Sequence, residues 1–205
     1  MQAYNNVEKR IIILTINRRL VMKKFFSSYN IAIMALFVAL LAICSWISLP
    51  IGPVPFTLQT FAVFVVGGLL GFKRGTVTVV VYILLGLVGV PVFSGFKGGV
   101  GVIVGPTGGY ILGFILTEIV ISLGVKFMKV ENEALKMLVM FVFCVIGDAL
   151  CFVVGTIQFM AVTGNILSVS LTYCVIPYII PDIVKIIVAV IVVNRVKKYV
   201  SIFND

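Results

Sequence analysis

Six apolar stretches constrain the fold of this chain more than any other feature. A helix needs ~20 apolar residues to cross ~30 Å of hydrocarbon. The chain has 205 residues, 61% hydrophobic and 11% charged, whereas a soluble domain is about 45–50% apolar and about 25% charged. The sequence therefore predicts an all-α integral membrane protein with six transmembrane helices. The stretches lie at about 29–49, 56–72, 75–92, 107–128, 136–162 and 174–196.

The second and third stretches are short and separated only by Lys73 and Arg74, which predicts a tight helical hairpin. We expect a cytoplasmic N-terminal segment at 1–28, one membrane domain at 29–198 and a cytoplasmic tail at 199–205. The run Met22-Lys23-Lys24 resembles a natural start, and a start there would make residues 1–21 an upstream extension.

The basic residues indicate how the chain is oriented. Six precede the first stretch, two lie between the second and third, three between the fourth and fifth, and three follow the sixth. Fourteen of the sixteen Lys and Arg residues thus fall on one side, which the positive-inside rule makes cytoplasmic, with both termini there. The net charge of +9 is therefore a topology signal, not a nucleic-acid surface.

Several chemistries are disfavoured by what the sequence lacks. It contains no histidine, its acids are scattered singly, and it has no Walker motif. We therefore expect no catalytic residues, no metal site, no cofactor and no ATP hydrolysis by this chain. Its four cysteines lie inside apolar runs without CxxC spacing, which predicts buried thiols at Cys44, Cys144, Cys151 and Cys174.

Two loops on the predicted outward side have unusual compositions. Residues 50–55 contain three prolines and form either a stiff connector or a cover that folds over a cavity or dips into the lipid. Residues 91–109 contain seven glycines, and Thr107 is a plausible N-cap whose helix end suits a carboxylate or carbonyl ligand. The glycines Gly105, Gly109 and Gly113 equally suit close helix packing, and both interpretations stay open.

The last stretch carries charge inside the membrane. Pro177 and Pro181 predict either a kinked helix or one that begins at Pro181. Asp182 and Lys185 are three residues apart and share a helix face, so they form a structural ion pair or recognise a polar ligand. Gln59 is a further polar candidate, for an amide-like ligand group or for a hydrogen bond between helices.

Other membrane positions have less definite roles. Glu118 and Asp148 lie within predicted spans and have no charged partner at helical spacing, so each could face a ligand, a neighbouring helix or a coupling protein. A stripe of small residues follows one face of the first span and serves either as a docking surface for another subunit or in packing within the bundle. Its members are Ala32, Ala35, Ala39 and Ala42.

Four motifs occur in one order along the chain. They are Gly52-Pro-Val-Pro-Phe-Thr-Leu-Gln-Thr60, Pro91-Val-Phe93, Gly105-Pro-Thr-Gly-Gly-Tyr110, and Pro177-Tyr178 followed by Asp182-Ile-Val-Lys185. Over about residues 29–198 this series resembles the BioY family, the biotin-specific S components of energy-coupling factor (ECF) transporters. The resemblance implies a six-helix protein of a bacterial or archaeal cell membrane that binds biotin from outside. It also implies a transmembrane coupling subunit and two cytoplasmic ATPases as partners.

The same resemblance implies roles for individual residues. Ala35 and Ala39 match the small-residue motif that contacts the coupling subunit, and Asp182 and Lys185 match the acidic and basic residues near biotin. Biotin has a ureido head, an apolar ring and a carboxylate tail, so a site needs polar groups, apolar walls and positive potential. The candidate substrate-binding residues are Asp182, Lys185, Gln59, Thr107, Gly108, Tyr110, Phe93, Trp46 and Tyr178.

The chain departs from the family pattern at two places. Ile180-Pro181-Asp182 replaces the usual Pro-Gly-Asp, and Gln158 stands where a tryptophan is common. No role is carried over to Lys97. Three other classes remain as alternatives: an autonomous secondary transporter for biotin or another small solute, an intramembrane enzyme, and a purely structural membrane subunit. A preference for desthiobiotin over biotin is equally open.

Overall fold

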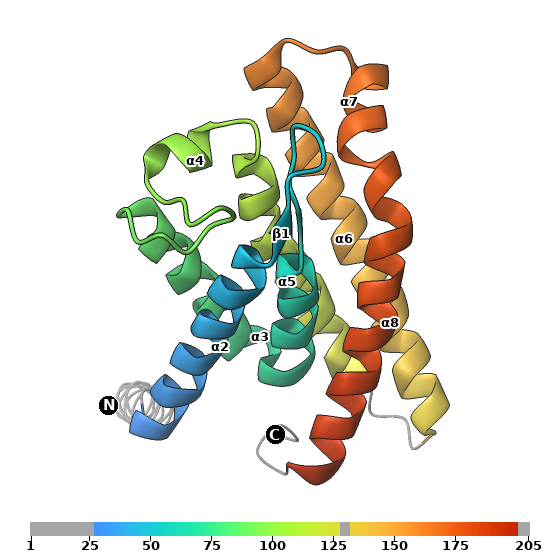
Figure 1. The fold of residues 1–205 in the computed structure, drawn as a ribbon. Coiled ribbons are helices and arrows are strands. Elements are labelled where there is room, and N and C mark those ends of the chain that lie inside the picture. The colour runs from blue at the N-terminus through green and yellow to red at the C-terminus, as the bar shows by residue number, and fades with distance from the viewer. Residues whose placement is uncertain (1–26, 128–131, 201–205) are drawn as a thin grey trace, which may run out of the picture.

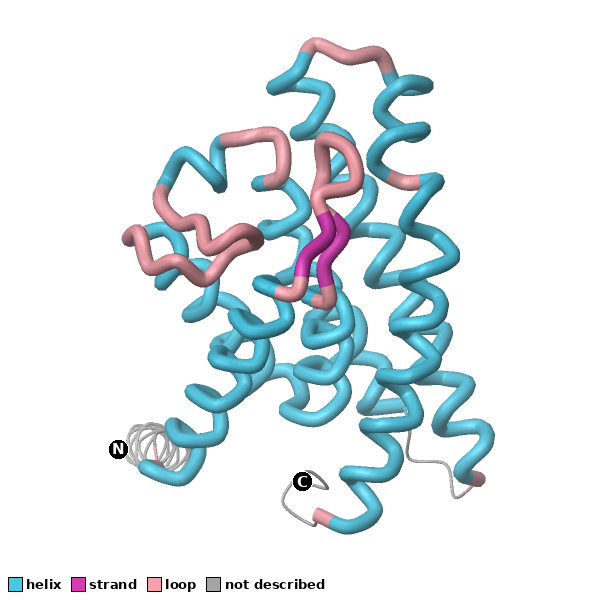
Figure 2. Tube along the Cα trace, in the orientation of Figure 1, coloured by secondary structure: helices cyan, strands magenta, loops and turns pink. Residues whose placement is uncertain are grey.

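A computed structural model describes residues 27–127 and 132–200 of the chain. The expected upstream extension at 1–21 and residues 201–205 of the expected tail lie outside the described residues. The described part is helical except for its loops and one very short strand pair (Figure 2). Five helices are long and apolar enough to cross a membrane. They are α2 (Ser28–Trp46), α3 (Gln59–Leu87), α5 (Gly108–Phe127), α6 (Glu133–Thr163) and α8 (Ile176–Tyr199).

The predicted helical hairpin lies within the single range of α3. Gly71 interrupts this range with φ of 66° and ψ of 176°, a conformation that glycine adopts without steric cost. The amide Nε2 of Gln59 lies 2.8 Å from the hydroxyl of Tyr82, although 23 residues of straight helix would separate them by about 35 Å. The two parts of α3 therefore fold back on each other, and they run in different directions in Figure 1.

The proline-rich loop between α2 and α3 is held by a short antiparallel strand pair. Strand β1 (Ser48–Leu49) pairs with β2 (Phe56–Thr57), with Ser48 opposite Thr57 and Leu49 opposite Phe56. Figure 2 shows this pair with its connecting loop beyond it. Residues 50–55 are thus the tip of a hairpin.

Two short helices were not predicted from the sequence. The helix α4 (Val100–Val104) forms inside the glycine-rich loop, and α7 (Leu167–Cys174) precedes α8. Both are too short for the hydrophobic pattern of a membrane span to reveal them.

The last long helix, α8, begins before Pro181, where one of the two alternatives placed its start. It starts at Ile176, with Pro177 in its first turn, and continues through Pro181. The alternative start at Pro181 is therefore wrong. Proline is tolerated in the first turn, where its missing N–H has no intrahelical partner, whereas Pro181 removes one bond from the helix interior.

Glycines bring α5 against its neighbours. A Cβ atom on Gly109 would lie 2.7 Å from the carbonyl oxygen of Val154, and one on Gly113 would lie 2.9 Å from Sγ of Cys151. These contacts confirm the helix-packing interpretation for both glycines, because any larger residue would push α6 away. Gly105 differs, since it ends α4 and does not pack α5 against α6.

Figure 1 shows how the described ends are placed. The start of α2, the start of α6 and the end of α8 lie at one end of the bundle. The strand pair, α4 and α7 lie toward the other end. The four cysteines are free and buried, as predicted.

Candidate functional site

A cavity of about 360 Å³ lies beneath the β1–β2 hairpin and the loop that contains α4. Its volume falls within the roughly 300–1,000 Å³ typical of small-molecule sites. The proline loop therefore covers a cavity, which was one of its two interpretations. The hairpin tip contributes Pro53, Val54 and Pro55, and further walls come from α3, α5, α6 and α8.

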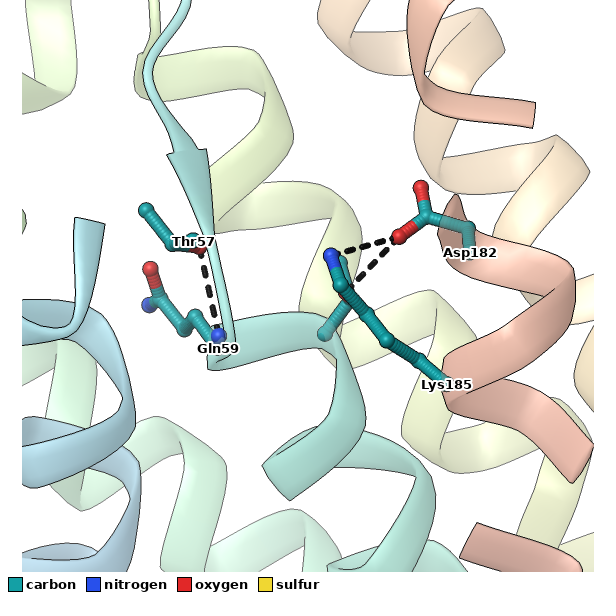
Figure 3. A network of polar contacts seen from close by, with 5 residues as sticks. Thr57, Gln59, Asp182 and Lys185 are labelled. Atoms are coloured by element: carbon teal, nitrogen blue, oxygen red, sulfur yellow. Dashed lines mark hydrogen bonds and ion pairs between the residues drawn. The ribbon is translucent and has the colours of Figure 1, made fainter. Parts of the chain in front are cut away.

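A buried ion pair stands at one wall of this cavity (Figure 3). Nζ of Lys185 lies 2.7 Å from Oδ1 of Asp182, and the two residues are only 7% and 3% exposed. Lys185 also donates to Oγ1 of Thr60 at 3.1 Å, and Thr60 donates to Oδ1 of Asp182 at 3.2 Å. The ammonium further lies 4.1 Å from the centre of the Phe56 ring, a distance suited to a cation–π contact. The predicted shared face is confirmed, and three side chains from two helices fix its geometry.

Gln59 lines the cavity but already has partners. Its side-chain nitrogen donates to the hydroxyl of Tyr82, and its backbone N–H donates to Oγ1 of Thr57 at 3.2 Å (Figure 3). The hydrogen bond between helices, one of the two predicted alternatives, is therefore present. Its side-chain oxygen has no partner among the described residues, so this acceptor remains available to a ligand.

Three predicted aromatic residues also line the cavity. Tyr178 donates its hydroxyl to the carbonyls of Val54 and Ile51, which ties the hairpin tip to α8. Tyr110 shares a 3.4 Å hydrogen bond with Thr156. Phe93 is buried with its ring edge-on to Tyr82 at 5.6 Å. These rings give the cavity flat apolar walls.

Thr107 lies directly before α5, as the N-cap prediction requires, and lines the cavity. Its carbonyl accepts from the N–H groups of Tyr110 and Ile111 at 3.2 and 3.4 Å. The start of α5 therefore faces the same space. Gly108 is not among the described lining residues: its Cα is so close to the carbonyl of Ile103 that an added Cβ would lie 1.7 Å from the oxygen.

Trp46 likewise does not occur among the described residues that line the cavity. Its indole N–H donates to the carbonyl of Pro91 at 2.8 Å, and its ring stacks on Phe96 at 4.9 Å. The contacts of Trp46 attach the glycine-rich loop to the end of α2.

Three further residues line the cavity that reasoning from the sequence did not assign to the site. Thr60 is the last residue of the quoted proline-rich motif, so that motif was the available signal for it. Lys97 is exposed and lines the cavity, and no acidic side chain pairs with it in the described part of the chain. Asp148 also lines the cavity and is 7% exposed. Its side chain could be placed only once α6 had been packed against α8.

The family departures find structural explanations. Gln158 donates its side-chain nitrogen to the carbonyls of Ile103 and Gly105, at 2.7 and 2.8 Å, and so holds α4 against α6. The run that contains Pro181 stays helical, and Asp182 still reaches Lys185.

A second, apolar cavity of about 480 Å³ lies among α6, α7 and α8. Asp148 and Phe152 line both cavities and therefore form part of the wall that they share.

The sequence matches the model of the BioY family over residues 19–202. It is 40% identical to the biotin transporter BioY of Thermotoga maritima over 163 residues, which cover 80% of this chain and 92% of that protein. It is 36% identical to a probable biotin transporter BioY of Pyrococcus horikoshii over 168 residues, 82% of this chain and 96% of that protein. The fold is similar to the crystal structure of the S component for biotin from an ECF-type ABC transporter. That match has a TM-score of 0.74 and 30% identity, and it covers 83% of this chain and 91% of the other.

Proposed function

Because the chain belongs to the BioY family, we propose that it is the biotin-binding S component of an ECF-type uptake transporter. The single observation that carries the proposal is the covered cavity with the Asp182–Lys185–Thr60 network on its wall. Burying an ion pair costs desolvation free energy, so charged residues inside the membrane usually face a cavity or a partner. A polar ligand head in this cavity would form hydrogen bonds with the pair. As a member of a transporter family, the chain is a binding and transport protein and not an enzyme.

Burial supports one orientation of biotin in the cavity. Asp182 and Lys185 are buried and present both an acceptor and a donor, which suits the neutral ureido head. Their charges cancel, so they offer little attraction to an anionic tail. Lys97 is exposed at the cavity and unpaired within the described residues, which suits the carboxylate. The N-terminus of α5 beside Thr107 adds positive potential for the same tail.

The proposal includes a six-span topology. Each part of α3 then crosses the membrane once, with Gly71 at the reversal. The start of α2 and the end of α8 lie at the same end of the bundle, as an even number of membrane crossings requires (Figure 1). The excess of basic residues then assigns that end to the cytoplasm and the cavity to the outside.

Transport needs partners, because the sequence carries no nucleotide-binding motif. We infer a transmembrane coupling subunit and two cytoplasmic ATPases. On α2, Ala32, Ala35 and Ala39 are exposed whereas Ala42 is buried, so most of the small-residue stripe is open to a neighbouring helix. Biotin uptake by cells that express this chain is expected to stop when the ATPases are deleted. Uptake that persists without them would favour the autonomous secondary transporter.

Calorimetric titration of the detergent-solubilised protein tests the binding function directly. The protein is first stripped of ligand retained from purification and is then titrated with biotin and with desthiobiotin. We expect tight binding of biotin at one site per chain. No heat from either ligand, on a sample that unfolds cooperatively on heating, would overturn the proposal.

A further inference from the structure

Asp148 is an acid of the cavity that no part of the proposed site yet uses. It lies on α6, and it lines the same cavity as Asp182 and Lys185. It is more than nine-tenths buried. In the described part of the chain no hydrogen-bond donor reaches its carboxylate, and no lysine or arginine forms an ion pair with it.

Within the described residues, Asp148 has no ion pair of its own. Asp182 is neutralised by Lys185 at 2.7 Å, whereas the carboxylate of Asp148 adds a second acceptor to the same wall region. A carboxylate removed from water is costly unless donors replace the water. An empty cavity supplies those donors as water, and a ligand that displaces the water must bring N–H or O–H groups of its own.

The polar groups of the cavity together form a recognisable pattern. Both hydrogen bonds to Asp182 go to Oδ1, so its other oxygen has no partner among the described residues. The cavity therefore offers one free carboxylate oxygen of Asp182, the ammonium of Lys185 and the carboxylate of Asp148. Apart from the side-chain oxygen of Gln59, which is a further acceptor, these groups are two acceptors and one donor, and they match a cyclic urea, whose carbonyl is flanked by two N–H donors.

We propose that Asp148 is a specificity-determining residue of this cavity, whose carboxylate accepts the second ureido N–H of the ligand while Asp182 accepts the first. The inference rests on the proposed function and names the ligand class more narrowly. The site selects cyclic ureas with both nitrogens unsubstituted.

The test combines variants of the protein with variants of the ligand. Wild-type protein, Asp148→Asn and Asp148→Leu are titrated with biotin and with the two biotin derivatives methylated on one or the other ureido nitrogen. Loss of a charged hydrogen bond predicts about 10- to 100-fold weaker biotin binding for Asp148→Leu. A smaller loss is expected for Asp148→Asn, which keeps a neutral acceptor.

The methylated ligands separate a direct contact from a structural effect. Methylation of the nitrogen that faces Asp148 is expected to weaken binding to wild type strongly and to Asp148→Leu much less. Methylation of the other nitrogen is expected to weaken binding to both proteins by the same factor. A third ligand, 2-iminobiotin, carries a positively charged head and is expected to lose more affinity than biotin in both variants.

Two results would overturn the inference while leaving the proposed function intact. One is biotin binding by Asp148→Leu with wild-type affinity, as expected if the carboxylate serves only the second cavity. The other is an equal response of wild type and both variants to the two methylated ligands. If wild type itself binds no biotin, the proposed function fails instead. Thermal unfolding without ligand shows whether each variant is folded. If Asp148→Leu does not fold, Asp148→Asn, which preserves the size of the side chain, is compared with wild type instead.

Discussion

Asp182 and Glu118 are both buried acids inside the membrane bundle, and each accepts a hydrogen bond from a threonine, but the rest of their surroundings differ. Asp182 has a lysine at 2.7 Å, a threonine hydroxyl at 3.2 Å and a cavity beside it. Glu118 is 0% exposed and receives one hydrogen bond, from Thr76 at 2.6 Å. Its other oxygen, Oε1, has no partner among the described residues.

The contrast extends to the packing around each acid. Besides α3, α5 and α6, the cavity is bordered by loops, a short strand pair and a helix that contains proline. The interface between α3 and α5 around Glu118 is closed by glycine: a Cβ on Gly75 would lie 2.2 Å from Oε1. Burial of an acid is therefore a poor guide to ligand binding by itself. We expect an acid beside a cavity to serve a ligand, and one in a closed interface to serve the contact between helices.

Replacing Asp182 should produce the largest effect. The change Asp182→Ala removes an acceptor and leaves Lys185 buried without its counter-ion. Loss of one member of such a pair costs about 2–5 kcal/mol, or roughly 30- to several-thousand-fold in affinity. We expect biotin binding to weaken by an amount in this range when measured by calorimetry.

Glu118→Ala is the matched control for that change. It also truncates a buried acid, but in the closed interface, so biotin affinity of the folded fraction is expected to stay within about threefold of wild type. Equal losses in the two variants would break the contrast between the regions. They would mean that the loss of any buried acid lowers biotin affinity, whether or not the acid lies beside the cavity.

Much of the fold could be predicted because a helix that crosses the bilayer needs an apolar run of a defined length. Apolar runs indicated α2, α5, α6 and α8 nearly to their ends, and the Lys73–Arg74 interruption indicated the hairpin within α3. The short helices α4 and α7 were missed because they have too few turns to produce a period. The start of α8 was left open because proline is compatible both with a first turn and with a kink.

The site was harder to predict, for reasons that individual residues make clear. Asp182 and Lys185 are neighbours on one helix, so their spacing was enough to pair them. Thr60 joins them from 125 residues away in sequence, and no local rule indicates such a contact. Trp46 was expected to supply a cavity wall, because its type suits stacking. Its indole N–H instead has a carbonyl acceptor in the next loop, a contact that only the tertiary arrangement determines.

Gly75→Ala should have the next largest effect, on stability rather than on binding. The added methyl group meets Oε1 of Glu118 in a closed interface, and overpacking of this kind costs about 1–3 kcal/mol. We expect a lower midpoint of thermal unfolding in detergent and unchanged biotin affinity of the folded fraction. The double variant Gly75→Ala with Glu118→Ala should recover part of the loss, since truncating Glu118 makes room for the methyl. Without any recovery, the clash with Glu118 would not be the cause.

Lys97→Ala should have the smallest effect, because Lys97 is exposed and water already screens its charge. An exposed charge pair contributes about 0.2–1 kcal/mol, which predicts a loss of biotin affinity of up to about fivefold. The loss should disappear with biotin methyl ester, which has no negative charge, and should shrink as salt is raised. Asp182→Ala, in contrast, should weaken the acid and the ester equally, because it acts on the head. If Lys97→Ala weakens the ester as much as the acid, then Lys97 does not contact the tail, and biotin lies the other way round in the cavity.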